Sequence, residues 1–272
     1  MVVLHSDTIN YIRAITCILI LSYSCITDWR TRRAPHMLWE VMTTIGVLLL
    51  LIEVFSTSYD TRYQVMFYFV ISYTFIYLLV NFIYYFINRY LKGAFGGADA
   101  NALLALSVLY PYYPTLHLLN ISLPIVAFPQ SPIFTLAAFG NALVLNLVLP
   151  VTIFAYNILH VPISELKSNV IPAFLGYKMK VEDIPGKFVR PMHSYEEVDG
   201  KVVKKFRAFK YPEIDEKFGR QLVEWKKRGM IPETLWVTPK IPFLIPITLG
   251  VISALLYGDI MVQLVMFIAN LI

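Results

Sequence analysis

Two aspartates stand at the polar ends of two long apolar segments, and their placement there could support chemistry. Asp28 ends the first apolar run, and Asp99 follows the glycine-rich stretch 93–98 and opens the fourth run. A carboxylate at bilayer depth costs about 2.5–3.5 kcal/mol even on the lenient insertion scale, so such acids are candidates for function. Two carboxyl groups held close together cannot both ionise easily and share a proton. One can then deprotonate a water molecule while the other hydrogen-bonds a scissile peptide carbonyl, so the two residues predict an aspartyl dyad for peptide hydrolysis.

Each aspartate also has a structural explanation that needs no partner. Asp99 could cap the helix that it opens, because a carboxylate there accepts hydrogen bonds from free backbone N–H groups. Asp28 could pair with Arg30 or Arg32 just beyond it. Both explanations stay open at the level of the residues alone.

The glycines before Asp99 favour the catalytic interpretation. Gly96 and Gly97 permit backbone conformations closed to residues with a Cβ, and they let a substrate strand approach closely. We expect this loop to flex and carry Asp99 toward Asp28. Glu40, one short loop beyond Asp28, is a candidate acid for recognising a cationic substrate.

The elements that must position these residues are predicted to be membrane helices. The chain is 57% hydrophobic, and its mean hydropathy is +0.62. About 20 apolar residues cross the hydrocarbon core, and lipid admits only segments whose backbone is fully hydrogen-bonded. Six stretches meet or approach that length: 8–27, 37–56, 64–87, 99–113, 132–159 and 241–257. We therefore expect an all-α integral membrane protein with six transmembrane helices and a small cytoplasmic soluble domain.

Charge predicts the orientation and the domain boundaries. Arginines follow the first and third runs, and basic loops face the cytoplasm, which puts both aspartates near the cytoplasmic face of a multi-pass cell-membrane protein. We expect a membrane domain at 1–160 with helices 1 to 5, a cytoplasmic soluble domain at 161–240, and the sixth helix with an interfacial segment at 241–272. Within the soluble domain, 201–207 predicts a strand and 215–228 an amphipathic helix.

Other catalytic chemistries have no recognisable pattern in the sequence. The histidines lack the i, i+4 spacing of a metal site; they are His5, His36, His117, His160 and His193. Cys17 and Cys25 match no zinc or redox spacing. We therefore predict no metal, no cofactor and no nucleic-acid partner, with membrane lipids as the surroundings.

Two motifs resemble those of a known family. Asp28-Trp29-Arg30 followed by Arg33-Ala34-Pro35-His36 resembles the Asp-x-Arg…Ile-Pro-Asn element of type IV prepilin peptidases, and Gly96-Gly97-Ala98-Asp99 resembles their Gly-x-Gly-Asp motif. The six-helix layout and the segment 236–242 look most like the archaeal preflagellin peptidases. The chain departs from the pattern at His36, at Ala98 and at Ala100-Asn101. Alanine at position 98 requires a loop conformation that alanine can adopt.

The resemblance implies a membrane aspartic endopeptidase of the archaellum or of type IV pilus-like filaments. Such an enzyme removes the short basic leader peptide from an archaellin or pilin-like precursor at the cytoplasmic membrane face. Asp28 and Asp99 match the two catalytic aspartates of the family motifs.

Three other functions stay open. A proton- or cation-coupled transporter could use Asp28 and Asp99 as ion ligands, although acids at one membrane face suit it less than acids at mid-membrane. A presenilin-like protease would show a Tyr-Asp pair where this chain has Thr27-Asp28. A scaffold for filament assembly would need no dyad.

Overall fold

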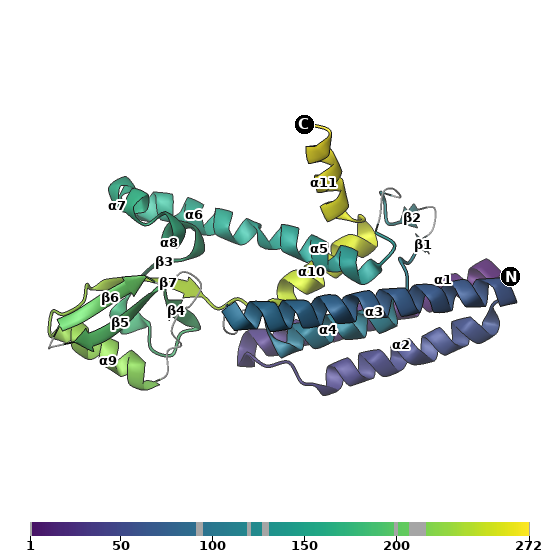
Figure 1. Cartoon of the computed structure of the whole chain (residues 1–272), viewed down its shortest axis with the longest axis horizontal. Helices are drawn as coiled ribbons and strands as arrows, with labels where there is room; N and C mark the ends of the chain where they lie inside the picture. The colour runs from purple at the N-terminus through teal and green to yellow at the C-terminus, as the bar shows by residue number, and fades with distance from the viewer. Residues whose placement is uncertain are drawn as a thin grey trace. The chain divides into compact units, whose positions relative to one another are not determined.

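A computed structural model describes residues 2–90, 95–118, 121–126, 131–198, 201–206 and 216–271. It divides the chain into two compact units (Figure 1). The first unit runs to Asn146 and resumes at Pro242, and the second unit is Leu147–Ile241. The basic residue Lys92 and the first two residues of the glycine-rich stretch, Gly93 and Ala94, lie outside the described residues.

The first unit is built almost entirely from helices. Its elements are α1 (Val2–Thr31), α2 (Met37–Ser56), α3 (Tyr59–Tyr90), α4 (Gly97–Leu109), α5 (Phe134–Asn146), α10 (Leu244–Leu256) and α11 (Ile260–Ala269), with a short hairpin of β1 (Leu116–Leu118) and β2 (Ile121–Leu123). The predicted segment 37–56 coincides with α2, and the other predicted runs fall on helices of the first unit or on the α5–α6 segment.

Length and apolar composition support fewer crossings than six. Four helical segments in the described residues are long and apolar enough to span a membrane: Asp7–Thr31, Met37–Ser56, Tyr59–Phe86 and Phe134–His160. The pair α10 and α11, bent by 77°, makes a fifth if it counts as one span. The fourth predicted run corresponds to α4, which has only 13 residues.

Helix α4 lies inside the first unit, packed against α2 and α3. Nine of its 13 residues are buried. Gly46 of α2 lets the backbone at the end of α4 come close, because a Cβ at Gly46 would lie 2.9 Å from Cα of Leu109. Because protein rather than lipid surrounds α4, a helix shorter than the bilayer can hold a polar residue such as Asp99 at its first turn.

A buried ion pair joins α1 to α2. Nη2 of Arg13 lies 2.8 Å from Oε2 of Glu53, and the two side chains are 1% and 6% exposed. The Tyr112 hydroxyl donates to the other carboxylate oxygen of Glu53, and Asn10 accepts a hydrogen bond from Arg13. The pair ties α1, α2 and the segment after α4 together with few of its polar atoms left unsatisfied.

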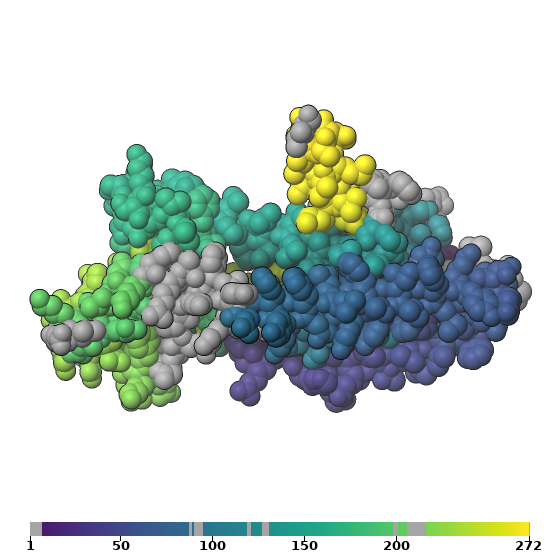
Figure 2. Space-filling view, viewed as in Figure 1, coloured from purple at the N-terminus to yellow at the C-terminus, as the bar shows by residue number. Residues whose placement is uncertain are grey.

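Helix α3 presents aromatic side chains at the surface. Figure 2 shows α3, in blue, along one outer face of the first unit. Its exposed aromatic residues are Tyr59, Tyr63, Phe67, Tyr68, Tyr73, Phe75, Tyr77, Phe82, Tyr84, Tyr85 and Phe86. Exposed aromatic and aliphatic residues in this number suit contact with lipid rather than with water.

The second unit mixes helices and strands. Its elements are α6 (Val148–His160), α7 (Ile163–Ser168), α8 (Val170–Leu175), β3 (Tyr177–Lys180), the 3₁₀ turn η1 (Val181–Asp183), β4 (Val189–Pro191), β5 (His193–Val198), β6 (Lys201–Phe206), α9 (Glu216–Lys227) and β7 (Thr234–Pro239). Strand β7 lies between β3 and β4, antiparallel to both, and β5 pairs with β6 as a hairpin.

The all-α class therefore describes the chain only in part, because the second unit contains sheets. The strand predicted at 201–207 is β6, and the helix predicted at 215–228 is α9; positions 207 and 215 lie outside the described residues. Helix α9 buries Leu222 and Trp225 against the strands and turns of this unit. Its apolar face supplies the core that such short strands need for stability.

Candidate active site

Asp28 lies in the last turn of α1 and is half-buried. The helix ends just beyond it, where Arg32 adopts a positive φ of 56° and donates its N–H to the Asp28 carbonyl over 2.9 Å. Arg32, one of the two arginines predicted as a partner for Asp28, thus contacts it through the backbone at the end of α1.

Asp99 lies in the first turn of α4, and only 7% of it is exposed. The backbone N–H of Gly96 donates to Oδ2 of Asp99 over 3.2 Å. Asp99 therefore accepts a capping hydrogen bond at the start of its own helix, as the structural explanation predicted. A carboxylate held by a single backbone donor still has lone pairs available for water or substrate.

Glycine at position 96 provides space for the Asp99 side chain rather than a special backbone conformation. Gly96 has φ −84° and ψ 153°, an extended conformation that any residue can adopt. A Cβ there would lie 3.0 Å from Oδ2 of Asp99, whereas a Cβ at Gly97 would meet nothing within 4 Å. The expected need for a conformation closed to side chains is therefore wrong at Gly96, and the flexing of this loop stays a prediction.

The two aspartates lie in one neighbourhood of the first unit. The chain segments that carry them both contact the beginning of α10: Sγ of Cys25, one turn before Asp28, lies 3.0 Å from Oγ1 of Thr248, and the ring of Phe95, just before Gly96, packs edge-on against Phe243. The start of α10 is therefore a common support for the end of α1 and the start of α4.

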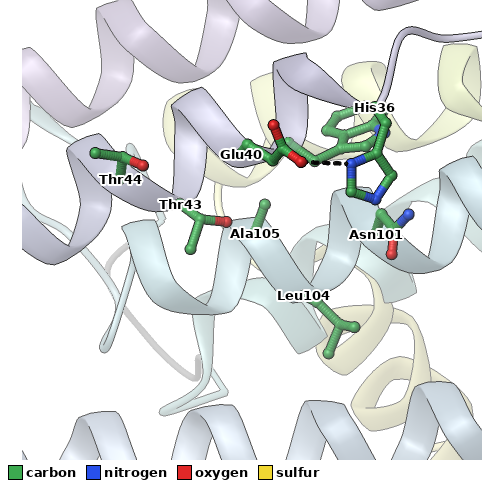
Figure 3. Close-up of a pocket in the computed structure, with 8 residues that line it drawn as sticks. His36, Glu40, Thr43, Thr44, Asn101, Leu104 and Ala105 are labelled. Atoms are coloured by element: carbon green, nitrogen blue, oxygen red, sulfur yellow. Dashed lines mark hydrogen bonds and ion pairs between the residues drawn. The ribbon is translucent and has the colours of Figure 1, made fainter.

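Glu40 lines a groove between α2 and α4, which we call the α2–α4 groove. Figure 3 shows Glu40 on α2 and His36 just before that helix, with Asn101 on the facing helix. Nδ1 of His36 lies 3.0 Å from Oε1 of Glu40. The groove has a volume of about 360 Å³, and its other lining residues are Trp39, Thr43, Thr44, Leu104 and Ala105.

Sequence reasoning did not connect Asn101 with Glu40. The sequence did contain a clue to this groove. His36 and Asn101 are two of the positions at which the chain departs from the family motifs, and both line the α2–α4 groove. Their spacing from Glu40 in sequence could not show that the two helices face each other there. In the described part of the chain, no three His, Cys, Asp or Glu side chains are grouped so as to hold a metal ion.

Comparison with known proteins matches two parts of the chain to peptidases. Residues 15–131 match the type IV leader peptidase family, and residues 168–260 match the archaeal peptidase A24 C-terminus, type II. Together the two matches cover more than two thirds of the chain. The first includes both aspartates and the α2–α4 groove.

Curated relatives from three archaea carry the name preflagellin peptidase. The chain is 27% identical to that of Methanococcus voltae over 252 residues, 90% of this chain and 95% of the relative. It is 26% identical to that of Methanococcus maripaludis, over 88% of this chain and 92% of the relative. With the Methanocaldococcus jannaschii protein it shares 29% identity over 60% of this chain, and it spans 63% of that relative, slightly less than two thirds. The matches and the two motifs agree: over residues 15–131 the chain is similar to the type IV leader peptidase family, and over residues 168–260 to the C-terminal part of archaeal A24 peptidases.

Proposed function

We propose that this protein is a membrane aspartic endopeptidase that removes the short basic leader peptide from archaellin or type IV pilin-like precursors. Asp28 and Asp99 are its catalytic residues. The observation that carries the proposal is that the end of α1 and the start of α4, whose aspartates are 71 positions apart in sequence, both contact the beginning of α10. The relatives named preflagellin peptidase support the substrate class.

The two carboxyl groups divide the work of hydrolysis. One, as a carboxylate, removes a proton from the attacking water, and the other, protonated, donates a hydrogen bond to the scissile carbonyl. The proton taken from water then passes to the leaving amine as the peptide bond breaks. The Gly96 N–H donor supports this by keeping the Asp99 carboxylate at a set position over the start of α4.

The site has the surroundings that such a reaction needs. Asp99 is buried in the first unit, and Phe95 beside it is 6% exposed, so bulk water has little access from that side. Low exposure strengthens the interaction between two carboxyl groups and makes them titrate as a pair. Half-buried Asp28 leaves the other side open to a precursor.

We also propose the membrane arrangement predicted from the sequence. The chain crosses the bilayer six times, with both aspartates near the cytoplasmic face and lipids around α3. The domains are 1–160, 161–240 and 241–272. In this arrangement α4 crosses as a helix packed against α2 and α3.

Incubation of the purified protein with an archaellin precursor and with a pilin-like precursor tests the function. We expect a product shortened by the leader, seen by mass spectrometry as a new N-terminus. A protein that leaves both precursors intact in detergent and in lipid vesicles would overturn the proposal. Uptake of protons or cations by those vesicles, without cleavage, would instead favour the transporter.

A further inference from the structure

The α2–α4 groove is formed by one face of each helix. The lining residues of α2 recur at positions 36, 39, 40, 43 and 44, and those of α4 at 101, 104 and 105. Residues three and four apart share a helix face, so both sets are continuous stripes. A volume of about 360 Å³ is enough for one long side chain with the backbone that carries it.

The groove carries one acidic group, and the side chain beside it is a histidine. Among the residues that line this described part of the first unit, Glu40 is the acid, and none is lysine or arginine. Its carboxylate contacts His36 and is 66% exposed. Thr43, Thr44 and Asn101 add neutral hydrogen-bonding groups. This combination favours a ligand with a cationic end and hydrogen-bond donors.

The groove and the Asp99 carboxylate lie on opposite sides of the same end of α4. Asn101 follows Asp99 by two residues, which turns it by about 200° around the helix. The width of a helix with its side chains is about 10 Å. An extended peptide advances about 3.3 Å per residue, so about three residues of a bound peptide span the distance from the Asp99 carboxylate to the α2–α4 groove.

A bound peptide can pass from the Asp99 carboxylate to the α2–α4 groove over Gly97. This residue precedes Asn101 by four positions, which places it at the open end of the same α4 face. It is exposed, and a Cβ there would meet nothing within 4 Å. Glycine therefore leaves the surface bare on the way from Asp99 to the groove.

We propose that the α2–α4 groove binds a lysine or arginine side chain of the leader peptide, about three or more residues from the scissile bond, through the Glu40 carboxylate. This inference rests on the proposed function and adds a specificity residue to it. The catalytic pair cleaves without regard to that side chain, and Glu40 selects precursors by charge.

A charge exchange tests the proposal. Glu40→Gln should raise KM about fivefold for a precursor with a basic leader, with kcat little changed, since an exposed ion pair contributes modestly. Glu40→Lys should prefer a precursor whose leader lysines and arginines are replaced by glutamate, reversing the preference of the unmodified protein. An unchanged KM for Glu40→Gln, or an unreversed preference for Glu40→Lys, would overturn it.

Two further variants separate recognition from other effects. Asp60→Asn removes an exposed acid at the first turn of α3 and should leave the charge preference unchanged. Gly97→Phe should raise KM for long leaders more than Gly97→Ala does, because only the larger side chain reaches the path to the groove. Equal KM values for these two variants would remove Gly97 from the proposed path.

Failure of this inference differs from failure of the proposed function. If Glu40 variants cleave all precursors with unaltered preference, the groove is not the leader site and the peptidase assignment stands. If the unmodified protein cleaves no precursor, the peptidase assignment itself fails.

Discussion

The amide of Gly96 and the carboxylate of Asp99 are joined by a hydrogen bond of 3.2 Å, and a methyl group on Gly96 would lie 3.0 Å from the same carboxylate oxygen. The residue before the helix thus holds the aspartate and leaves room for it at the same time. Alanine would keep the N–H donor but push the carboxylate aside.

Gly96→Ala should therefore lower kcat for precursor cleavage by about tenfold, because small displacements of a reacting group are expensive in rate. Folding should survive, since the Gly96 backbone is extended. The loss should exceed that of Gly97→Ala, whose methyl group enters open space. Steady-state cleavage with both variants measures the difference, and equal losses would contradict the steric role of Gly96.

Asp28→Asn and Asp99→Asn should each abolish cleavage. An amide keeps the shape of the carboxyl group but can neither act as a base nor share the proton. The variants should elute in gel filtration as the unmodified protein does. Near-normal cleavage by either folded variant would show that the dyad assignment is wrong.

The pH profile of kcat/KM should be bell-shaped. Activity requires one carboxyl group protonated and the other ionised, so it falls when both are protonated and when both are ionised. The two limbs belong to the pair and not to either residue alone. Cleavage measured over a wide pH range checks this, and a profile with a single limb would indicate that one titrating group suffices.

Inhibitors should act as on an aspartyl enzyme. A reaction run by two carboxyl groups needs no metal and no serine or cysteine nucleophile, so chelators and reagents directed at those side chains should leave cleavage intact. A peptide mimic with a hydroxyl group at the scissile position should inhibit it. Loss of activity with a chelator, restored by added zinc, would point to a metalloprotease.

The second unit should lose stability in mild acid through His193. Burial, aided by the charge of Lys204, lowers the pKa of His193 to about 4 from an ordinary value of 6.5. Between these values the unfolded chain binds a proton that the folded chain does not, so stability falls as the pH drops. The fall between pH 7 and pH 5 should be about 1–2 kcal/mol.

Hydrogen exchange in β5 and β6 at the two pH values measures this effect, because His193 lies on β5 and pairs with Phe206 of β6. A His193→Gln variant should show a smaller difference between the two pH values. The same pH dependence with and without the histidine would assign the effect to other groups.

Local sequence patterns predicted the helices well and their contacts poorly. The apolar run 37–56 coincides with α2 because hydropathy and length decide a membrane helix by themselves. The prediction that Asp28 and Asp99 form a dyad came from their placement at the polar ends of two apolar runs and from motifs that resemble a family, not from periodicity. The shared support of both segments by α10 depends on contacts between distant residues, such as Cys25 with Thr248, which no local pattern shows.

Segment 236–242 illustrates the same limit. In the sequence it resembles a family segment that leads into the last helix, yet residues 234–239 form β7, the middle strand of a sheet. Its partners, β3 and β4, lie more than 40 residues earlier, so nothing within the segment could predict its central place. The break between α10 and α11 falls where the sixth helix was predicted to give way to an interfacial segment, but the bend of 77° between them was not evident from composition.

The buried pair of Arg13 and Glu53 has a consequence for how the protein reaches the membrane. Each charge alone would add a few kcal/mol to the insertion of its own helix. Once the two are 2.8 Å apart they neutralise each other, and neither helix presents an isolated charge to lipid. Insertion is therefore most favourable when α1 and α2 enter the bilayer together as a hairpin. The fold then depends on α1 still being held by the translocation machinery when α2 has been synthesised.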